Sequence, residues 1–248
     1  MKKIFYLLFV LPLIIISCES NPEAYFSVDE IDTEVGQKVL FTNESQNADA
    51  FEWDFGDGTV SYDVNPVHIY NSTGTFEVIL VARSGNGNES SSSISITVRI
   101  PTLLEIEVLE YYDEYVVPDA SVILYPTSVD WDNQTNMLYE GFTDKDGIVV
   151  FANLEPYIHY VDVWEKNHDN YTLRDEDINF IRTPEVLPNK INRFIAWVDY
   201  VEHGKGVARG SRAVVIKKLE RKNSDKAAAA GSSDTDGWEE LYKRSIKK

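Results

Sequence analysis

Apolar and polar residues alternate along most of the chain in short segments, a pattern that predicts β-strands separated by turns. Between residues 24 and 100, segments rich in Val, Ile, Phe and Tyr are separated by clusters of Gly, Asn and Asp, which is typical of a β-sandwich. In 75–82 apolar residues recur at every second position, and Ile79 and Val81 fill the other face, so this strand is expected to be central. Strands are predicted over 24–28, 38–43, 50–55, 67–70, 75–82 and 93–100.

A second series of apolar segments begins after Pro101. Its last long member, 191–201, has apolar residues at alternate positions and is predicted to be a closing strand. Further apolar strand segments are predicted over 103–109, 117–125, 148–151 and 160–164. The pattern therefore predicts an all-β fold of two tandem β-sandwich domains, at 24–100 and 101–201, each large enough to bury its own core.

The first 17 residues have the pattern of a secretory signal peptide. A basic start at 1–3 precedes the apolar run 4–16, and the small Ser17 stands before Cys18. The apolar run is shorter than the roughly 20 residues that a membrane-spanning helix needs. The sequence apolar-apolar-Ser-Cys resembles the bacterial lipobox, which implies cleavage before Cys18, a diacylglycerol on its sulfur and a lipidated linker over 18–23. The alternative is a plain signal peptide with an incidental cysteine.

Cys18 is the only cysteine of the chain, so no disulfide can form within one molecule. A lone cysteine at a signal-peptide boundary is explained if it carries lipid. Stable anchoring takes two or more acyl chains, since each buried methylene contributes only about 0.8 kcal/mol. The first predicted partner is therefore a membrane, bound through lipid on Cys18.

The chain is strongly acidic, with 23 Lys and Arg residues against 41 Asp and Glu residues and a formal net charge of −18. Cleavage before Cys18 removes two lysines and no acidic residue, which leaves 21 against 41 and a net charge of −20. Such a surface repels nucleic acid, which we exclude as a partner. It suits an extracytoplasmic protein and could attract Ca²⁺ weakly.

One segment of the first predicted domain resembles a known family. The residues of 51–59, Phe-Glu-Trp-Asp-Phe-Gly-Asp-Gly-Thr, are similar to the signature of PKD domains, which are Ig-like β-sandwiches. Two further blocks, 65–70 and 74–78, match the rest of that pattern in the same order. The resemblance covers nearly a third of the chain and implies an Ig-like sandwich over 24–100.

The alternation around the signature predicts which of its side chains are buried. Trp53 and Phe55 alternate with polar residues, so both are expected on the core face. Asp54 and Asp57 are either calcium ligands or turn residues that accept hydrogen bonds from backbone amides, and we favour the turn role. His68 is expected to be a packed, hydrogen-bonded side chain, because no nucleophile or second base accompanies it.

The second domain resembles the carboxypeptidase-regulatory-like, or transthyretin-like, β-sandwich. A strand of alternating apolar residues in 117–125 is followed by Thr-Asp-x-x-Gly at 143–147 and by a strand that ends toward Tyr160. In that family the Thr-Asp-x-x-Gly sequence is a turn between paired strands. Asp144 also begins a segment like an EF-hand loop, but Ile148 stands where that loop needs its third oxygen ligand. A hairpin turn is therefore predicted there.

Two polar, aromatic segments of the second domain are candidate binding sites. Trp131 lies in the polar segment 130–134 and is either the tip of a sugar- or protein-binding loop or a residue that folds back on the sandwich. The Tyr-rich segment 110–115 is predicted to be a hairpin with aromatic pairs across its strands.

The remaining residues, 202–248, are predicted to be a flexible tail with one further strand at 213–219. The part 222–237 has the composition of a linker, and it could derive from cloning. From residue 217 onward nine basic residues face six acidic ones. This basic tail could therefore contact its own acidic body, an acidic partner or a membrane surface.

The last residues predict a short amphipathic helix. Trp238, Leu241, Tyr242 and Ile246 fall on one helical face, and Asp236 is the predicted N-cap. Because so short a helix is marginal alone, it needs a surface to dock on. Trp238, Leu241 and Tyr242 are therefore the predicted binding residues of the tail.

The sequence contains none of the common catalytic or phosphate-binding motifs, so a non-enzymatic role is predicted, with no catalytic residues, no metal site and no cofactor other than the lipid. The combination of lipobox and module types resembles outer-membrane lipoproteins of Bacteroidota, facing the periplasm or the cell surface. The resemblance implies an accessory subunit of an envelope complex for secretion, uptake or adhesion, bound to an envelope protein. The alternatives are a glycan-binding surface lipoprotein, with a polysaccharide partner, and a hydrolase that uses paired carboxylates.

Overall fold

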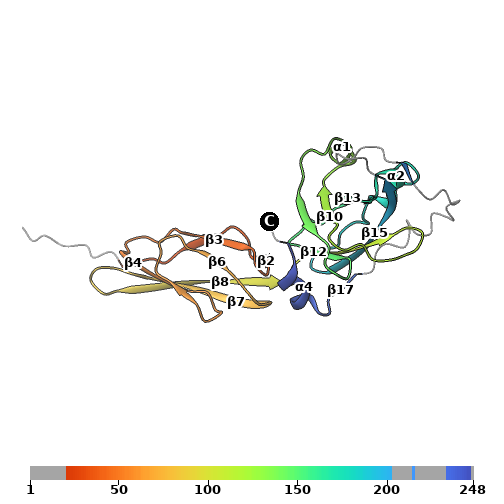
Figure 1. Cartoon of the computed structure of the whole chain (residues 1–248). Coiled ribbons are helices and arrows are strands. Elements are labelled where there is room, and N and C mark those ends of the chain that lie inside the picture. Colours follow the sequence, from red (N-terminus) through yellow and green to blue (C-terminus); the bar gives the residue numbers. More distant parts are fainter. Residues whose placement is uncertain (1–20, 203–213, 216–232, 247–248) are drawn as a thin grey trace, which may run out of the picture. The chain divides into compact units, whose positions relative to one another are not determined.

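Strands make up most of the regular structure, and the helices are short (Figure 1). The structure is a computed structural model that describes residues 21–202, 214–215 and 233–246. Contacts divide these residues into two units, of which the first holds 21–29, 40–66 and 77–94 and the second holds the others. The predicted all-β fold is confirmed, as is the short helix near the end of the chain.

Eight strands between residues 26 and 99 form two sheets, with the orders β1-β3-β6 and β2-β8-β7-β4-β5. Their bounds are β1 Phe26–Val28, β2 Asp32–Glu34, β3 Lys38–Asn43, β4 Ala50–Asp54, β5 Val60–Ser61, β6 Val67–Ile69, β7 Gly74–Arg83 and β8 Glu89–Arg99. β7 lies between β8 and β4, as its two apolar faces predict. β8 begins four residues before its predicted start, because its serines carry no apolar alternation and follow the pairing of the long neighbouring strand.

The core of the first unit is aromatic. Trp53 is completely buried, and its ring lies 5.0 Å from that of Phe26 and 5.6 Å from that of Phe41. Phe55 is buried beside Phe41, with 5.4 Å between ring centroids. The Trp53 indole also donates a hydrogen bond of 2.9 Å to the carbonyl oxygen of Asp63. Trp53 and Phe55 thus share the core face, as predicted.

The strands of the second unit beyond residue 100 follow the order β11-β10-β13-β14-β15-β9-β12. Their bounds are β9 Leu103–Glu110, β10 Ser121–Tyr125, β11 Tyr139–Phe142, β12 Ile148–Ala152, β13 Tyr160–Glu165, β14 His168–Asp169 and β15 Ile191–Glu202. Two short strands of the tail, β16 Val214–Val215 and β17 Ser233–Asp234, pair with β15. Alternate residues of β9, β10, β12, β13 and β15 meet in one hydrophobic core.

β15 is the strand on which this unit is organised. It runs parallel to β9, with Ile191 opposite Leu103 and Val198 opposite Glu110. The same strand pairs antiparallel with β14, β16 and β17. The predicted closing strand is confirmed, but the sequence pattern did not predict its parallel partner.

Four short helical segments complete the described fold: α1 Ser128–Asn133, α2 Tyr171–Arg174, η1 Ile178–Phe180 and α4 Trp238–Arg244. α1 replaces the loop expected there and begins where the Thr127 hydroxyl accepts a hydrogen bond from the Asp130 amide, at 3.1 Å. α4 starts at its predicted residue, but its N-cap is Gly237 rather than Asp236. Gly237 has a φ of 76°, a left-handed conformation that glycine adopts without a steric penalty.

Candidate interaction sites

The segment 233–246 lies against the second unit, and we call it the docking segment. It touches the unit at three places: β17 pairs with the start of β15, α4 contacts β9 and β12, and Ile246 pairs with β12. Figure 1 shows α4 and β17 at the same end of this unit. Three contacts were predicted for the basic tail: the rest of its own chain, an acidic partner or a membrane surface. For residues 233–246 the structure shows the first of these.

The three predicted binding residues of the tail, Trp238, Leu241 and Tyr242, are half-buried on one apolar cluster. The cluster consists of Leu103, Val150, Ala152 and Ile191, which come from β9, β12 and β15. Helix α4 has two acidic residues in its first turn and two basic residues in its last, an arrangement that complements the helix dipole. No residue of α4 is fully buried, so the helix rests on the surface of the unit.

Ile246 extends the free edge of β12. Its amide donates to the Val150 carbonyl at 2.8 Å, and its carbonyl accepts from the Ala152 amide at 3.0 Å. A methyl group built on Gly141 would lie 2.9 Å from the Ile246 side chain and 2.8 Å from that of Val149. A glycine at 141 is therefore what allows Ile246 to pack between β11 and β12.

Trp131, the other predicted binding residue, is buried in the second unit with 2% of its surface exposed. Its indole nitrogen donates to the Val161 carbonyl at 3.0 Å, and its ring stacks on Tyr171 at 5.5 Å and 12°. Arg174 lies over the indole at 5.8 Å and pairs with Asp132 at 2.5 Å. Of the two predicted alternatives, the structure has the one in which Trp131 folds back, so this ring is not available for a sugar to stack on.

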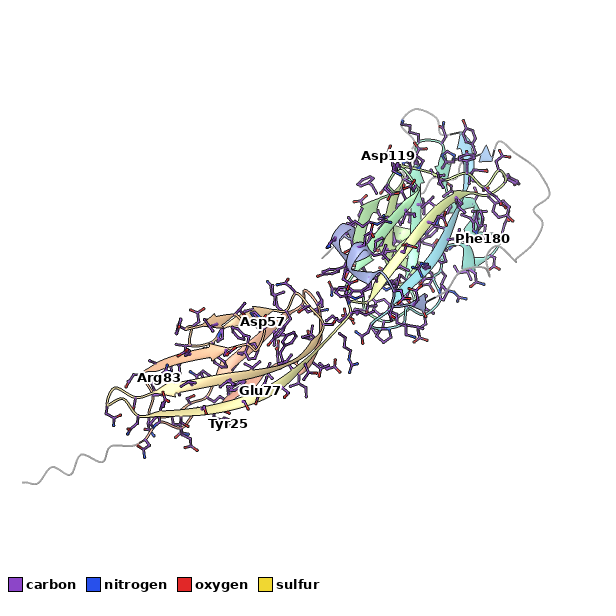
Figure 2. The ribbon with its side chains drawn as sticks, turned by 90° about the horizontal axis from the view of Figure 1, so that it is seen from below. Tyr25, Asp57, Glu77, Arg83, Asp119 and Phe180 are labelled. Atoms are coloured by element: carbon purple, nitrogen blue, oxygen red, sulfur yellow. The ribbon has the colours of Figure 1, made fainter. Side chains whose placement is uncertain are left out.

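The aspartates of segment 51–59 accept hydrogen bonds from backbone amides of their own turns. Asp54 accepts from the Gly56 amide at 2.9 Å, and Asp57 (labelled in Figure 2) accepts from the Thr59 amide at 3.0 Å. Asp144 in the second unit accepts in the same way from two backbone amides, at 2.9 and 3.1 Å. These contacts match the turn roles predicted for all three residues.

A chain of three polar side chains, Glu165, His168 and Tyr115, was not predicted. His168 Nδ1 lies 2.9 Å from a Glu165 carboxylate oxygen, and its Nε2 lies 2.7 Å from the Tyr115 hydroxyl. Burial, together with the negative charges of Glu110 and Asp113, raises the pKa of the Tyr115 phenol. The phenol therefore keeps its proton. In the tautomer of His168 in which Nδ1–H donates to the Glu165 carboxylate, Nε2 accepts from the Tyr115 hydroxyl.

The order acid, histidine, hydroxyl resembles that of a nucleophilic triad. A nucleophile needs its proton to leave easily, whereas the environment of Tyr115 holds the proton more tightly. The arrangement therefore fixes the 110–116 turn to β14, and it gives no support for catalysis. Tyr115 and His168 are 53 residues apart in sequence. Their contact could have been predicted only by placing the 110–116 turn next to β14 in the fold.

Two buried aspartates lie directly opposite each other beside this chain. Asp169 on β14 pairs in register with Asp199 on β15, and each is at most 2% exposed. Asp169 accepts a hydrogen bond from the Tyr171 amide at 3.1 Å, and the Thr172 hydroxyl donates to Asp199. Burial raises the pKa of Asp169 to about 7, and the charges of Asp199 and Asp162 act in the same direction.

The raised pKa of Asp169 predicts that the second unit becomes more stable toward acid pH. The carboxyl titrates near 3.9 in an unfolded chain, so its contribution is complete below about pH 4 and is lost by about pH 7. We expect Asp169→Asn, which mimics the neutral form, to raise the free energy of unfolding at pH 8 by on the order of 2–4 kcal/mol. At pH 4 the variant and the parent should agree within about 1 kcal/mol.

Urea titrations of both proteins at pH 4, 6 and 8 measure this difference. Asp175→Asn is the matched control, because the Asp175 side chain is 48% exposed and its replacement should leave the pH profile unchanged. An Asp169→Asn protein that is less stable than the parent at pH 8 would show that the charged carboxylate is favoured in the folded state.

A cleft of about 270 Å³ lies within the second unit beside β17. Leu104, Val186 and Phe194 form its apolar wall, and Ser233 of the docking segment lies at its border. Among the residues that the structure describes, no group of three or more His, Cys, Asp or Glu side chains is arranged to hold a metal ion. Within the same residues, no helix combines the length and apolar character needed to cross a membrane. Cys18 and most of the predicted strand 213–219 lie outside the described residues.

Residues 19–100 match the family model of the PKD domain, so the resemblance of segment 51–59 to that family is confirmed. Collagenase ColQ1 of Bacillus cereus is 43% identical over 58 residues, which is 23% of this chain and 6% of that protein. A second Bacillus cereus collagenase, ColA, is 27% identical over 159 residues, or 63% of this chain and 15% of that protein. This chain thus spans only a small part of the collagenases that it matches.

Among solved structures, the PKD1 domain of the Vibrio cholerae metalloprotease PrtV is 25% identical. It covers 32% of this chain and 98% of its own length, with a TM-score of 0.28. BcpA, the major pilin subunit of Bacillus cereus, is 6% identical and aligns over 73% of this chain and 71% of its own, with a TM-score of 0.40.

Proposed function

We propose that this protein is a non-catalytic lipoprotein of the bacterial outer membrane, in which the β-sandwiches act as an interaction or accessory subunit of an envelope complex. The observation that carries the proposal is the order of features along the chain: a sequence that resembles a lipobox and ends at Cys18, directly followed by residues 19–100, which match the PKD domain. The acidic surface, with a net charge of −18 for the whole chain, supports an extracytoplasmic partner that is not nucleic acid.

The lipid anchor makes the first testable difference. With Cys18 intact, we expect the protein to take up a labelled fatty acid and to sediment with membranes, because two or more acyl chains give stable binding. Cys18→Ala should abolish the label and release most of the protein into the soluble fraction. Ser91→Ala, a substitution elsewhere in the chain, is the control and should change neither the label nor the membrane fraction. A Cys18→Ala protein that still sediments and is still labelled would contradict the proposed anchor.

A pull-down from native membranes in mild detergent, followed by mass spectrometry, tests the role as a subunit. A reproducible set of envelope proteins supports it, and recovery of the chain alone argues against it. The glycan-binding alternative then becomes the stronger one. It is favoured by exposed rings elsewhere, such as Tyr62 at 69% and Phe142 at 64%, which could stack on sugars as Trp131 cannot. A screen of polysaccharides without any binding would remove that alternative, and binding that Tyr62→Ala and Phe142→Ala leave unchanged would show that these rings are not the site.

A further inference from the structure

The surface that receives the docking segment has the properties of a peptide-binding groove. Its apolar floor is formed by Leu103, Val150, Ala152 and Ile191, and one wall is the free edge of β12, which offers backbone groups to an extended chain. The occupant combines two familiar modes of peptide recognition, a helix laid on an apolar surface and a strand added to a sheet edge. An uncovered edge of this kind would be a site for association with other chains.

The docking segment is held by contacts that are numerous but individually small. Its helix has no fully buried residue, β17 contributes two paired residues, and Ile246 contributes one bridge. Two ion pairs add to these contacts, Arg193 with Asp234 and Arg244 with Asp144, the second at 3.8 Å. Every one of these contacts would be the same if the segment came from another copy of the chain.

The connection to the docking segment is long compared with the distance that it must cover. β16 pairs with Val201 and β17 pairs with Asn192, so the two anchors are nine residues apart on β15, or roughly 30 Å at 3.3 Å per residue. Residues 216–232 join these anchors. A chain of that length can extend to roughly 55–60 Å, so it can reach its own groove and also the groove of a neighbouring copy.

We propose that this groove is a binding site for the docking segment of a second copy, and that two chains exchange their segments reciprocally. The exchange needs no new complementarity, because each groove receives the sequence that it already fits. Binding within one chain is favoured because the connection gives the segment an effective concentration on the order of 1 mM at its own groove. The monomer therefore predominates in dilute solution, and the exchanged dimer appears as the protein concentration approaches that value.

Shortening the connection separates the two arrangements. Deletion of 219–230 leaves about five residues between β16 and β17, which reach at most roughly 22 Å, less than the roughly 30 Å between the anchors on β15. While β16 stays paired with β15, the segment of the shortened chain then cannot reach its own groove. We expect this protein, in the full mature chain with Cys18→Ser, to be a dimer at 10 µM by light scattering, whereas the chain of natural length is a monomer.

Fluorescence transfer between copies identifies the contact. One preparation carries a donor at Lys243→Cys on α4, and the other carries an acceptor at Lys145→Cys, whose neighbour Asp144 pairs with Arg244. The shortened chains should give strong transfer between copies. Leu241→Asp together with Ile246→Asp in the shortened chain should abolish both the transfer and the dimer. A shortened chain that stays monomeric, or that associates without transfer, overturns the proposal.

A second measurement avoids the deletion and any effect that it has on folding. Donor-labelled and acceptor-labelled chains of natural length are mixed at 10 µM and at 1 mM. We expect transfer between copies to rise at least tenfold from the lower to the higher concentration, because the effective concentration within one chain is on the order of 1 mM. Transfer that stays at the background level at 1 mM contradicts the exchange.

Discussion

The substitution Trp53→Ala is expected to lower the free energy of unfolding of the first unit by about 4 kcal/mol. Removing a large aromatic side chain from a packed core costs about 3–5 kcal/mol, and the Asp63 carbonyl, which accepts from the indole at 2.9 Å, loses its donor at a further cost of about 1 kcal/mol. The rings of Phe26 and Phe41 would face the resulting cavity. Small domains have about 5–15 kcal/mol of stability in total, so the variant should lose a large fraction of the stability of this unit and unfold at a much lower denaturant concentration.

Native-state hydrogen exchange of the backbone amides of β4 measures the change, since all residues of that strand belong to the first unit. Tyr62→Ala is the matched control: it also removes an aromatic ring, but one that is 69% exposed, and its effect should be within about 0.5 kcal/mol. A loss below about 1 kcal/mol for Trp53→Ala would show that this ring is not the centre of the core.

The substitution Trp131→Ala is expected to destabilise the second unit by about 3–4 kcal/mol. The indole packs in a cluster with Ile123, Tyr125 and Ile181, and its replacement leaves a cavity. The change also removes the hydrogen bond to the Val161 carbonyl and the stacking on Tyr171, which contribute about 0.5–1.5 kcal/mol each. Because Trp131 is buried, its loss should change stability and not the affinity for any surface ligand.

Val129→Ala on the same helix is the control for Trp131→Ala. Val129 is 63% exposed, so the variant should unfold within about 0.5 kcal/mol of the parent. Equilibrium urea unfolding provides the measurement for both proteins. If Trp131→Ala leaves stability unchanged but weakens sugar binding, the ring must leave its buried position in solution.

The strands and turns of the first 80 described residues could be predicted well, because each follows from residues that are close together in the sequence. The alternation in 38–43 predicts β3 with its observed bounds, Lys38–Asn43, and the Gly-Asp-Gly turn predicts where Asp57 bonds. Each of these features depends on residues that are near in sequence. The short strands β2 and β5 escaped prediction because two or three residues are too few to show a period.

The features that could not be predicted depend on residues far apart in sequence. Asp169 belongs to a segment that looks like a polar loop, yet it is buried in a strand that pairs with β15, and its register partner Asp199 lies 30 positions later. The burial of Trp131 has the same origin, since Val161 and Tyr171 close over it. A hydrophobic pattern reports which residues can be buried. Which polar residues are buried with them depends on the pairing of the strands.

The parallel pairing of β9 with β15 sets the order in which a growing chain can fold. Residues 103–110 emerge long before their partners at 191–198, and contacts so distant in sequence form slowly. The aromatic cluster of the first unit, by contrast, lies entirely within residues 26–55. In the interval between the two events, Leu104, Ile106 and Val108 have no sheet neighbour on the β15 side. That interval is when this chain most needs protection from association with other unfolded chains.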